Sequence, residues 1–162
     1  MNSAPRQGCQ PTHNMPSTHT CLLYHLIFAT KNRERVLRKE WQPRLHEYLG
    51  GIVNGLGGVA QGVGGVEDHG HLLVGLKPTH CLSDFVRELK KSSSTWITDA
   101  FAFRDFNWQE GYAAFTVSAS ARASVQNYIA DQAEHHRHKS FRDELIEFLN
   151  KSEVEYDEAY LD

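Results

Sequence analysis

The chain has few cysteines, no long hydrophobic run and no excess of positive charge, and each shortage excludes a class of protein. Its three cysteines are odd in number, widely spaced and without a Cys-x-x-Cys pair, which excludes a disulfide framework and a zinc knuckle. No apolar run is long enough to span a bilayer, and the N-terminus lacks the apolar core of a signal peptide. We therefore expect a cytoplasmic protein with free thiols and no membrane partner.

The charge is mildly negative and unevenly distributed. A formal net charge of −3 argues against a wide basic surface for duplex DNA. Residues 152–162 carry five acidic side chains and no basic one, and leaving those five charges out changes −3 to +2 for residues 1–151. A mildly positive body can still hold a few phosphates in a local groove, so charge alone does not decide the question of nucleic acid.

Length and patterning predict one domain with two dissimilar ends. The extension 1–17 is rich in Pro, Ser, Asn and Gln and is expected to be disordered, the domain occupies 18–151, and the acidic tail is 152–162. Alternating apolar residues predict strands near 19–30, 59–66, 70–76 and 115–117. Helical periodicity predicts helices near 40–54, 83–100, 118–138 and 141–149, with Ser83 and either Ser118 or Ser120 as N-caps.

The order strand, helix, strand, strand, helix, strand, helix predicts an α+β fold. It is the order of a ferredoxin-like, or RRM-like, split βαβ unit. We expect an antiparallel sheet with helices on one face and an added C-terminal helix, which leaves the other face free for a site. Because this topology hosts many unrelated functions, it implies no mechanism by itself.

Two histidines one residue apart, His69 and His71, stand in an apolar run. Side chains alternate along a strand, so both imidazoles point to one face while Gly70 between them points to the other. Neutral imidazole is the commonest metal ligand in proteins. On spacing alone, two packed or solvated strand histidines remain the more common alternative to a metal site.

A second group of candidates lies about sixty residues further along the chain. Tyr128 and Gln132 are four residues apart in a helical segment and therefore share a helix face. A metal ion beside a presented phenol indicates nucleophilic attack on phosphorus. Taken alone, Tyr128 is more consistent with core packing and Gln132 with a solvated helix surface. We interpret the nearby His135, His136 and His138 as a solvated helix end, and His25 as a packed or hydrogen-bonded strand residue.

Basic residues at two places are candidates for phosphate contacts. Such contacts give affinity without reading base sequence. An ordinary solvated surface is the equal alternative. The candidates are Lys31, Arg33 and Arg35 after the first strand, and Arg87, Lys90 and Lys91 on the second helix.

Four segments together resemble one family. They are HLIFATKNR at 25–33, EDHGHLLV at 67–74, WQEGY at 108–112 and YIADQAEHH at 128–136. In this order and at these separations, the chain from His19 to Asp162 resembles the single-tyrosine HUH transposases. These are small transposases of insertion sequences whose ends form hairpins.

The resemblance implies a reaction and a set of roles. It implies a homodimeric, metal-dependent DNA strand transferase, with active sites shared between subunits, that cleaves single-stranded DNA beside subterminal hairpins through a 5′-phosphotyrosine link. By position, His69, His71 and Gln132 would be the metal ligands and Tyr128, on the added C-terminal helix, the nucleophile. Mixed nitrogen and oxygen ligands suit Mn²⁺, and Mg²⁺ when DNA supplies further oxygens.

The chain departs from the family at Gly70, where a bulky apolar residue is usual. The ligand spacing is unaffected, but a buried side chain worth roughly 1–3 kcal/mol is lost. Two other functions therefore stay open. One is a catalytically weakened or domesticated domain on the same fold that binds single-stranded nucleic acid, and the other is a metal hydrolase of small phosphoesters.

Overall fold

The computed structural model describes residues 19–161, and the extension 1–17 predicted to be disordered lies outside them. Within that range the strands and α-helices follow in the order β1 (Leu23–Ala29), α1 (Gln42–Gly55), β2 (Val59–Gly65), β3 (His69–Gly75), α2 (Leu82–Phe101), β4 (Ala113–Val117), α3 (Arg122–Ala130), α4 (Gln132–His135) and α5 (Phe141–Lys151). Three short 3-10 helices accompany them: η1 (Lys31–Arg33), η2 (Ala119–Ala121) and η3 (Glu158–Tyr160). Each predicted strand and helix has a counterpart whose bounds differ by a few residues, except the helix predicted over 118–138.

The strands form one antiparallel sheet in the order β2-β3-β1-β4. This is the strand order of the split βαβ unit, so the prediction of an α+β, ferredoxin-like fold is confirmed. The central pair, β1 and β3, is bonded in a register that places Ile27 opposite His71. Because both central strands are covered on both faces, their sequences are nearly continuous apolar runs.

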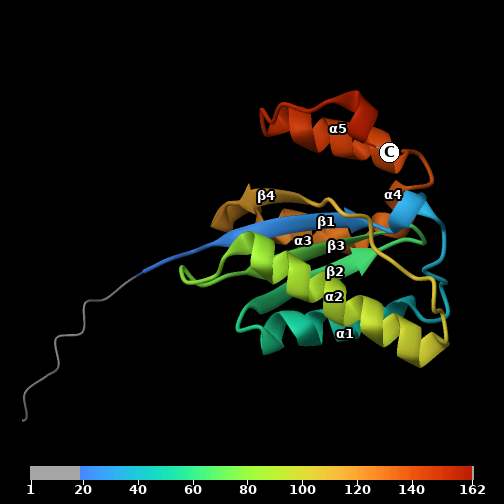
Figure 1. Cartoon of the computed structure of the whole chain (residues 1–162). Coiled ribbons are helices and arrows are strands. Elements are labelled where there is room, and N and C mark those ends of the chain that lie inside the picture. Colours follow the sequence, from blue (N-terminus) through green and yellow to red (C-terminus); the bar gives the residue numbers. More distant parts are fainter. Residues whose placement is uncertain (1–18, 162) are drawn as a thin grey trace, which may run out of the picture.

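The two faces of the sheet are covered by different helices (Figure 1). Helices α1 and α2 pack on one face against the apolar side chains of the central strands, Leu26, Phe28, Leu72 and Val74. The other face is not free, contrary to the expectation from the sequence. It is covered by α5, which contributes Phe141 and Leu149, and by α3, which contributes Ile129. The histidines of β1 and β3 therefore lie under a second helical layer.

The single helix predicted over 118–138 is divided in the structure. Helix α3 ends at Ala130 and α4 begins at Gln132, because Asp131 between them leaves the helical region at φ −93°, ψ 16°. Helix α3 therefore carries the tyrosine, two more helices follow it, and the tyrosine is not on the last helix of the chain. Of the predicted serine caps, Ser118 is the N-cap of η2, which leads directly into α3, but its side chain makes no capping hydrogen bond. Ser83 is not a cap, because it lies inside α2, whose N-cap is Cys81.

Gly70 of β3 and Gly64 of β2 lie on neighbouring strands, and a side chain added at each is expected to change the stability in opposite directions. A Cβ at Gly70 would meet only the carbonyl oxygen of Gly64, at 3.8 Å, an ordinary contact. A Cβ at Gly64 would lie 2.3 Å from the carbonyl oxygen of Ile129. We expect Gly70→Ala to raise the free energy of unfolding by about 0.5–1 kcal/mol, because glycine loses the most entropy in a strand. That corresponds to a rise in melting temperature of about 1–4 °C.

The matched control is Gly64→Ala, which forces α3 away from β2 and is expected to lower the melting temperature. Thermal unfolding followed by circular dichroism measures both variants under the same conditions. A lower melting temperature for Gly70→Ala would show that the face of position 70 is more tightly packed than the backbone contact indicates.

Candidate functional site

Both histidines of β3 are buried on the sheet face that α5 covers, with 1% of His69 and none of His71 exposed. Their Nδ1 atoms are engaged: that of His69 lies 2.6 Å from Oδ1 of Asp68, and that of His71 lies 3.0 Å from Nε2 of His25. Such partners fix the orientation of an imidazole and leave the other ring nitrogen available. Each Nε2 therefore faces the space between the sheet and α5. His25 is, as interpreted from the sequence, a packed and hydrogen-bonded strand residue.

Tyr128 of α3 lies beside these histidines in the same chain. Its ring is edge-on to the ring of His71, with centroids 6.0 Å apart, and to that of His25, with centroids 6.1 Å apart. The hydroxyl oxygen lies 3.4 Å from Nε2 of His135, and the side chain is half-buried. The structure thus places Tyr128 next to the paired histidines within one chain.

Gln132 is also placed in this cluster, despite the break before α4. Its side-chain amide nitrogen Nε2 lies 3.4 Å from the main-chain carbonyl oxygen of Tyr128, so the side chain of Gln132 turns back toward α3 across the break. Its Oε1 lies 3.0 Å from Nε2 of His136, and only 1% of the residue is exposed. The interpretation of Gln132 as a solvated helix residue is therefore excluded by its burial.

The structure adds two residues that the sequence reasoning missed, His136 and Glu144. Nε2 of His136 lies 3.0 Å from Nε2 of His69, and Oε2 of Glu144 lies 3.2 Å from the same His136 atom. The interpretation of 135–138 as a solvated helix end is wrong for His136, whose side chain is 10% exposed, whereas that of His138 is 81% exposed. Glu144 had a signal in the sequence, because it falls on the apolar side of α5 between Phe141 and Phe148.

These five side chains form the candidate site, which we call the His/Glu cluster: His69, His71, Gln132, His136 and Glu144. Four of them, all except Gln132, offer ligand atoms that lie within 4.8 Å of one another. Among the described residues, Nε2 of His71 and Oε2 of Glu144 are buried without a hydrogen-bond partner. Buried polar atoms without a partner are costly unless a cation or solvent satisfies them. The donor set therefore fits a divalent metal ion.

Burial governs the protonation of the cluster. It raises the pKa of Glu144 to about 8, with a further contribution from the charge of Asp68. It lowers the pKa of His71 well below the ordinary value and that of His136 to about 4. It also lowers the pKa of His25 to about 4. At neutral pH the imidazoles of His71 and His136 are therefore neutral, which is the form that binds metal ions.

These pKa shifts predict how the stability of the metal-free protein depends on pH. The pKa values of His25, His71 and His136 are lower in the folded state, so the unfolded chain takes up protons first as the pH falls below 6.5. Glu144, with its raised pKa, acts oppositely and is ionised only in the unfolded chain between pH 4.5 and about 8. We expect the melting temperature to rise from pH 5 to 6.5, where the histidines dominate, and to fall from pH 6.5 to 8.

Thermal unfolding in the presence of a chelator measures this profile. In the Glu144→Gln variant the decline above pH 6.5 should disappear while the rise below it remains. A decline of the same size in that variant would contradict the assignment to Glu144.

Two of the hollows that border the cluster are also lined by predicted site residues outside it. One, of about 240 Å³, is lined by Tyr128, His135 and Glu144 together with residues of α3 and α5. The other, of about 230 Å³, is lined by Arg33, Arg35, His136 and neighbouring residues. The predicted nucleophile and two of the predicted phosphate-binding residues therefore border openings next to the cluster.

The structure brings the first group of predicted basic residues near the site. The guanidinium of Arg33 lies 3.8 Å from Oδ2 of Asp68 and 4.8 Å from the ring centroid of Phe141. Arg35 and Lys31 are exposed close by in sequence. Because Asp68 also holds His69, Arg33 is linked through one carboxylate to the cluster.

The second group lies on α2, across the sheet from the histidines. The ammonium of Lys90 is bound by three successive carbonyl oxygens of residues 109–111, so it fixes that loop. Arg87 pairs with carboxylates of its own helix, and Lys91 is exposed. The structure does not bring these three residues to the cluster.

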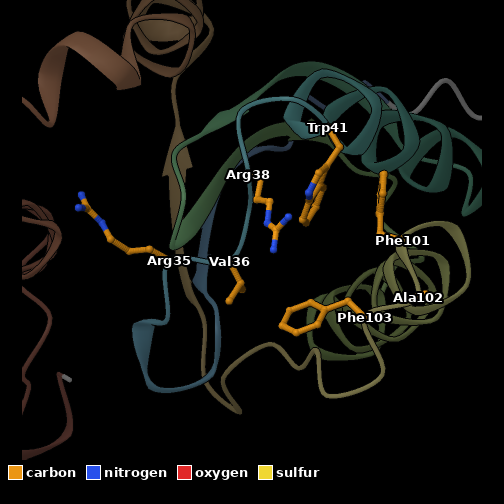
Figure 2. A pocket seen from close by; sticks show the side chains of 7 residues that line it. All are labelled: Arg35, Val36, Arg38, Trp41, Phe101, Ala102 and Phe103. Carbon is orange, nitrogen blue, oxygen red and sulfur yellow. The ribbon is translucent and has the colours of Figure 1, made fainter.

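A separate hollow of about 450 Å³ lies between the segment before α1 and the end of α2. Figure 2 shows Trp41, Phe101 and Phe103 around it, with Arg38 beside Trp41 and Arg35 pointing away from the rings. The rings of Trp41 and Phe101 stack with centroids 4.5 Å apart, so much of their surface is used in packing. Apart from Arg35, the hollow contains none of the predicted site residues.

Cys21 and Cys81 are free and exposed, and Cys9 lies outside the described range. None of the helices within residues 19–161 has the length and apolarity needed to cross a membrane.

A split βαβ sheet, a strand with paired histidines and a tyrosine on the helix after the last strand together define a class, the single-tyrosine HUH transposases. A sequence model of the family described as "Transposase IS200 like" matches residues 18–132, and the chain belongs to this family.

Individual relatives support this assignment. The ISDra2 transposase TnpA of Deinococcus radiodurans is 34% identical over 117 residues, which cover 68% of this chain and 84% of that protein. The transposase for insertion sequence element IS200 of Salmonella typhimurium is 27% identical over 117 residues, with 68% and 76% covered. A crystal structure described as a transposase from Deinococcus radiodurans matches with a TM-score of 0.61 and 33% identity over 75% of this chain and 98% of that one.

A second solved structure is similar in fold. It is a REP-associated tyrosine transposase bound to a REP hairpin, with a TM-score of 0.55 and 15% identity over 77% of this chain and 74% of that one. At this identity the likeness concerns the fold alone.

Proposed function

We propose that the protein is a metal-dependent transposase that cleaves and rejoins single-stranded DNA at hairpin-bearing ends through a 5′-phosphotyrosine intermediate. The observation that carries the proposal is the position of Tyr128, whose ring centroid lies 6.0 Å from that of His71 in the same chain. Membership of the transposase family supports DNA strand transfer as the reaction. The hairpin bound to the structurally similar transposase supports hairpin DNA as the ligand.

In the proposed reaction, Tyr128 supplies the nucleophile. Its phenolic oxygen forms a bond to phosphorus, the bond between phosphorus and the 3′ oxygen breaks, and the 3′ oxygen leaves as a hydroxyl after taking a proton from solvent. The phenolic proton passes to solvent in the hollow beside the half-buried ring. Rejoining is the reverse attack by a 3′-hydroxyl, and the phosphotyrosine conserves the bond energy, so ATP is not needed.

His69, His71 and Gln132 would hold the metal ion, Mg²⁺ or Mn²⁺. The buried, unpartnered Nε2 of His71 supports this assignment. A phenol has a pKa of about 10 and is a poor nucleophile at neutral pH. A bound divalent ion would polarise the phosphate and neutralise the charge that develops in the transition state.

The DNA strand is proposed to approach along η1 and the residues after it. Arg33 and Arg35 line the hollow that leads to His136, and Lys31 is exposed close by in sequence, which supports phosphate contacts by these three residues. Arg87 and Lys91 lie across the sheet from the cluster, so they would contact only DNA that extends to that side. Lys90 is already held by main-chain carbonyls. We also propose a cytoplasmic homodimer, as the family resemblance implies. Since Tyr128 already lies beside the histidines of its own chain, this dimer does not need to exchange tyrosines.

The test uses a pool of oligonucleotides that carry a hairpin flanked by randomised single strands, incubated with the protein and Mn²⁺ or Mg²⁺. With a label at the 3′ end, the proposed reaction gives a labelled protein band that survives denaturation. With a label at the 5′ end, it gives a shortened strand that a polymerase can extend. Mass spectrometry should then find the nucleotide on Tyr128.

The alternative function is a binding domain without cleavage. It is favoured by the burial of the cluster, because the two histidines of β3 and Glu144 are at most 2% exposed. Tight hairpin binding without any covalent product, with either metal, would replace the proposal with this alternative. Hydrolysis of small phosphoesters that does not depend on Tyr128 would instead indicate a phosphoesterase.

A further inference from the structure

The His/Glu cluster contains more ligand atoms than the family resemblance assigns. Nε2 of His69 lies 3.0 Å from Nε2 of His136 and 3.8 Å from Oε2 of Glu144. Nε2 of His71 lies 3.6 Å from that same oxygen. Metal–ligand bonds of about 2.0–2.2 Å in a tetrahedral site place the ligand atoms roughly 3.3–3.6 Å apart. The observed separations therefore surround a space of the size that a small divalent ion needs.

The hydrogen bonds around the cluster show that its centre is rich in lone pairs. Nδ1 of His136 donates to the carbonyl oxygen of Lys139, and Nδ1 of His69 donates to the carboxylate of Asp68, because neither partner can donate. In the tautomer that carries its proton on Nδ1, each imidazole has its lone pair on Nε2, and the Nε2 atoms of His69 and His136 face each other at 3.0 Å. Oε1 of Gln132, another acceptor, lies 3.0 Å from Nε2 of His136. Acceptors that converge in this way are stabilised by a cation between them.

The local structure explains how His136 and Glu144 reach this centre. Ser140 caps α5, since its hydroxyl oxygen accepts a hydrogen bond from the main-chain nitrogen of Asp143, and this places Glu144 in the first turn. Phe141 packs against the ring of His69, with centroids 4.4 Å apart, and draws the start of α5 onto the sheet. Glu144 is 2% exposed, and the neighbouring Lys139 pairs with Glu147 instead. Within the described range, the ion-pair partners of the buried carboxyl are imidazoles.

Both residues lie beyond residue 132, where the match to the family model ends, although His136 is the last residue of the fourth segment that carries the resemblance. His136 follows α4 and Glu144 belongs to α5. We propose that His136 and Glu144 join His69 and His71 as ligands of one metal ion, so that a single chain builds a centre of three imidazoles and one carboxylate. The proposal deepens the proposed function and rests on it for the use of the metal in cleavage, but not for metal binding itself.

The donor set determines which ion the centre takes. Imidazole nitrogens suit first-row transition ions, whereas Mg²⁺ prefers oxygen ligands in an octahedral arrangement and keeps several waters. Three nitrogens and one carboxylate oxygen therefore select a transition ion such as Mn²⁺, Co²⁺ or Zn²⁺ over Mg²⁺. Gln132 stays at the edge of the centre, where its Oε1 can supply a further oxygen.

The test is a titration of the chelator-treated full chain with Co²⁺, without DNA, followed by visible absorption. We expect one ion per chain, with the intense absorption of four- or five-coordinate Co²⁺, and no displacement by a thousandfold excess of Mg²⁺. His136→Ala and Glu144→Gln should each weaken Co²⁺ binding at least about 100-fold, since even outer partners of ligands contribute about 10–100-fold. The controls His138→Ala and Glu147→Gln, from the same segment, should bind as the unaltered chain does.

Unchanged affinity in the folded His136→Ala and Glu144→Gln variants would overturn the proposal, as would a weak octahedral spectrum in the unaltered chain. If circular dichroism shows that a variant is unfolded, NMR of the unaltered chain replaces it as the test. Each imidazole bound to Co²⁺ gives one strongly shifted N–H resonance, and these resonances are counted. Three of them support the centre and two contradict it. The titration contains no DNA, so the two proposals can fail separately. Metal binding through these residues, without DNA cleavage in the oligonucleotide assay, refutes only the proposed function. Cleavage together with unchanged metal affinity in the variants refutes only this inference.

Discussion

Tyr128→Phe is expected to form no covalent protein–DNA product and to lower the rate of strand cleavage by at least about a thousandfold, the scale on which loss of a nucleophile acts. Phenylalanine keeps the ring that packs against His71 and His25. The substitution removes the hydroxyl group, whose oxygen lies 3.4 Å from Nε2 of His135 at the long limit of a hydrogen bond. Hairpin binding, metal binding and the melting temperature should therefore stay close to those of the unaltered chain.

The matched control is Tyr48→Phe, which also removes only a hydroxyl group. Tyr48 stacks on Trp96 between α1 and α2, on the sheet face away from the cluster, with ring centroids 4.6 Å apart. This variant should cleave normally. Gel analysis with a 3′-labelled hairpin oligonucleotide measures both variants. An undiminished covalent product from Tyr128→Phe would mean that another residue attacks phosphorus.

The sheet and the direction of its side chains could be predicted from the sequence because period-two alternation is a local property of the chain. Once 69–75 is a strand, His69 and His71 must share a face, whatever packs on it. Helices α1 and α2 followed from their apolar stripes in the same way. What covers the opposite face depends on α5, and no local pattern states on which face a terminal helix will lie.

The relation between Tyr128 and Gln132 was predicted from their spacing, and the structure keeps them together by a different route. The helix breaks at Asp131, so the two residues belong to α3 and α4. The sequence does not predict this break, because residues 128–136 contain neither glycine nor proline.

His136 and Glu144 could not be placed from sequence for a tertiary reason. The three histidines at 135, 136 and 138 look alike locally, and only the return of α5 onto the sheet separates His136, whose side chain is 10% exposed, from His138, whose side chain is 81% exposed. The one available signal was the carboxyl group of Glu144 on an apolar stripe. A carboxyl group on an apolar stripe, with no basic residue one helical turn before or after it, indicates a ligand or a proton site rather than packing.

His71→Ala is expected to abolish metal-dependent cleavage, with a loss of at least about 100-fold, while hairpin affinity changes little. His71 is fully buried, and its Nε2 faces Oε2 of Glu144 at 3.6 Å. Alanine removes one imidazole of the cluster and leaves the basic residues near η1 untouched. Because the proposed function assigns the phosphate contacts, and with them the affinity for DNA, to those residues, binding and cleavage should separate in this variant.

The variant also removes the partner of His25 Nε2, and an unsatisfied buried group costs about 1–3 kcal/mol, so a lower melting temperature is expected as well. Circular dichroism at the assay temperature must therefore show that the variant is folded. His80→Ala is the matched control, because His80 is bound to the carbonyl oxygen of Leu56 on the other side of the sheet and should affect stability without affecting metal dependence. If folded His71→Ala cleaves DNA with the same metal dependence as the unaltered chain, His71 is not a metal ligand. His69 would then be the one imidazole that β3 supplies.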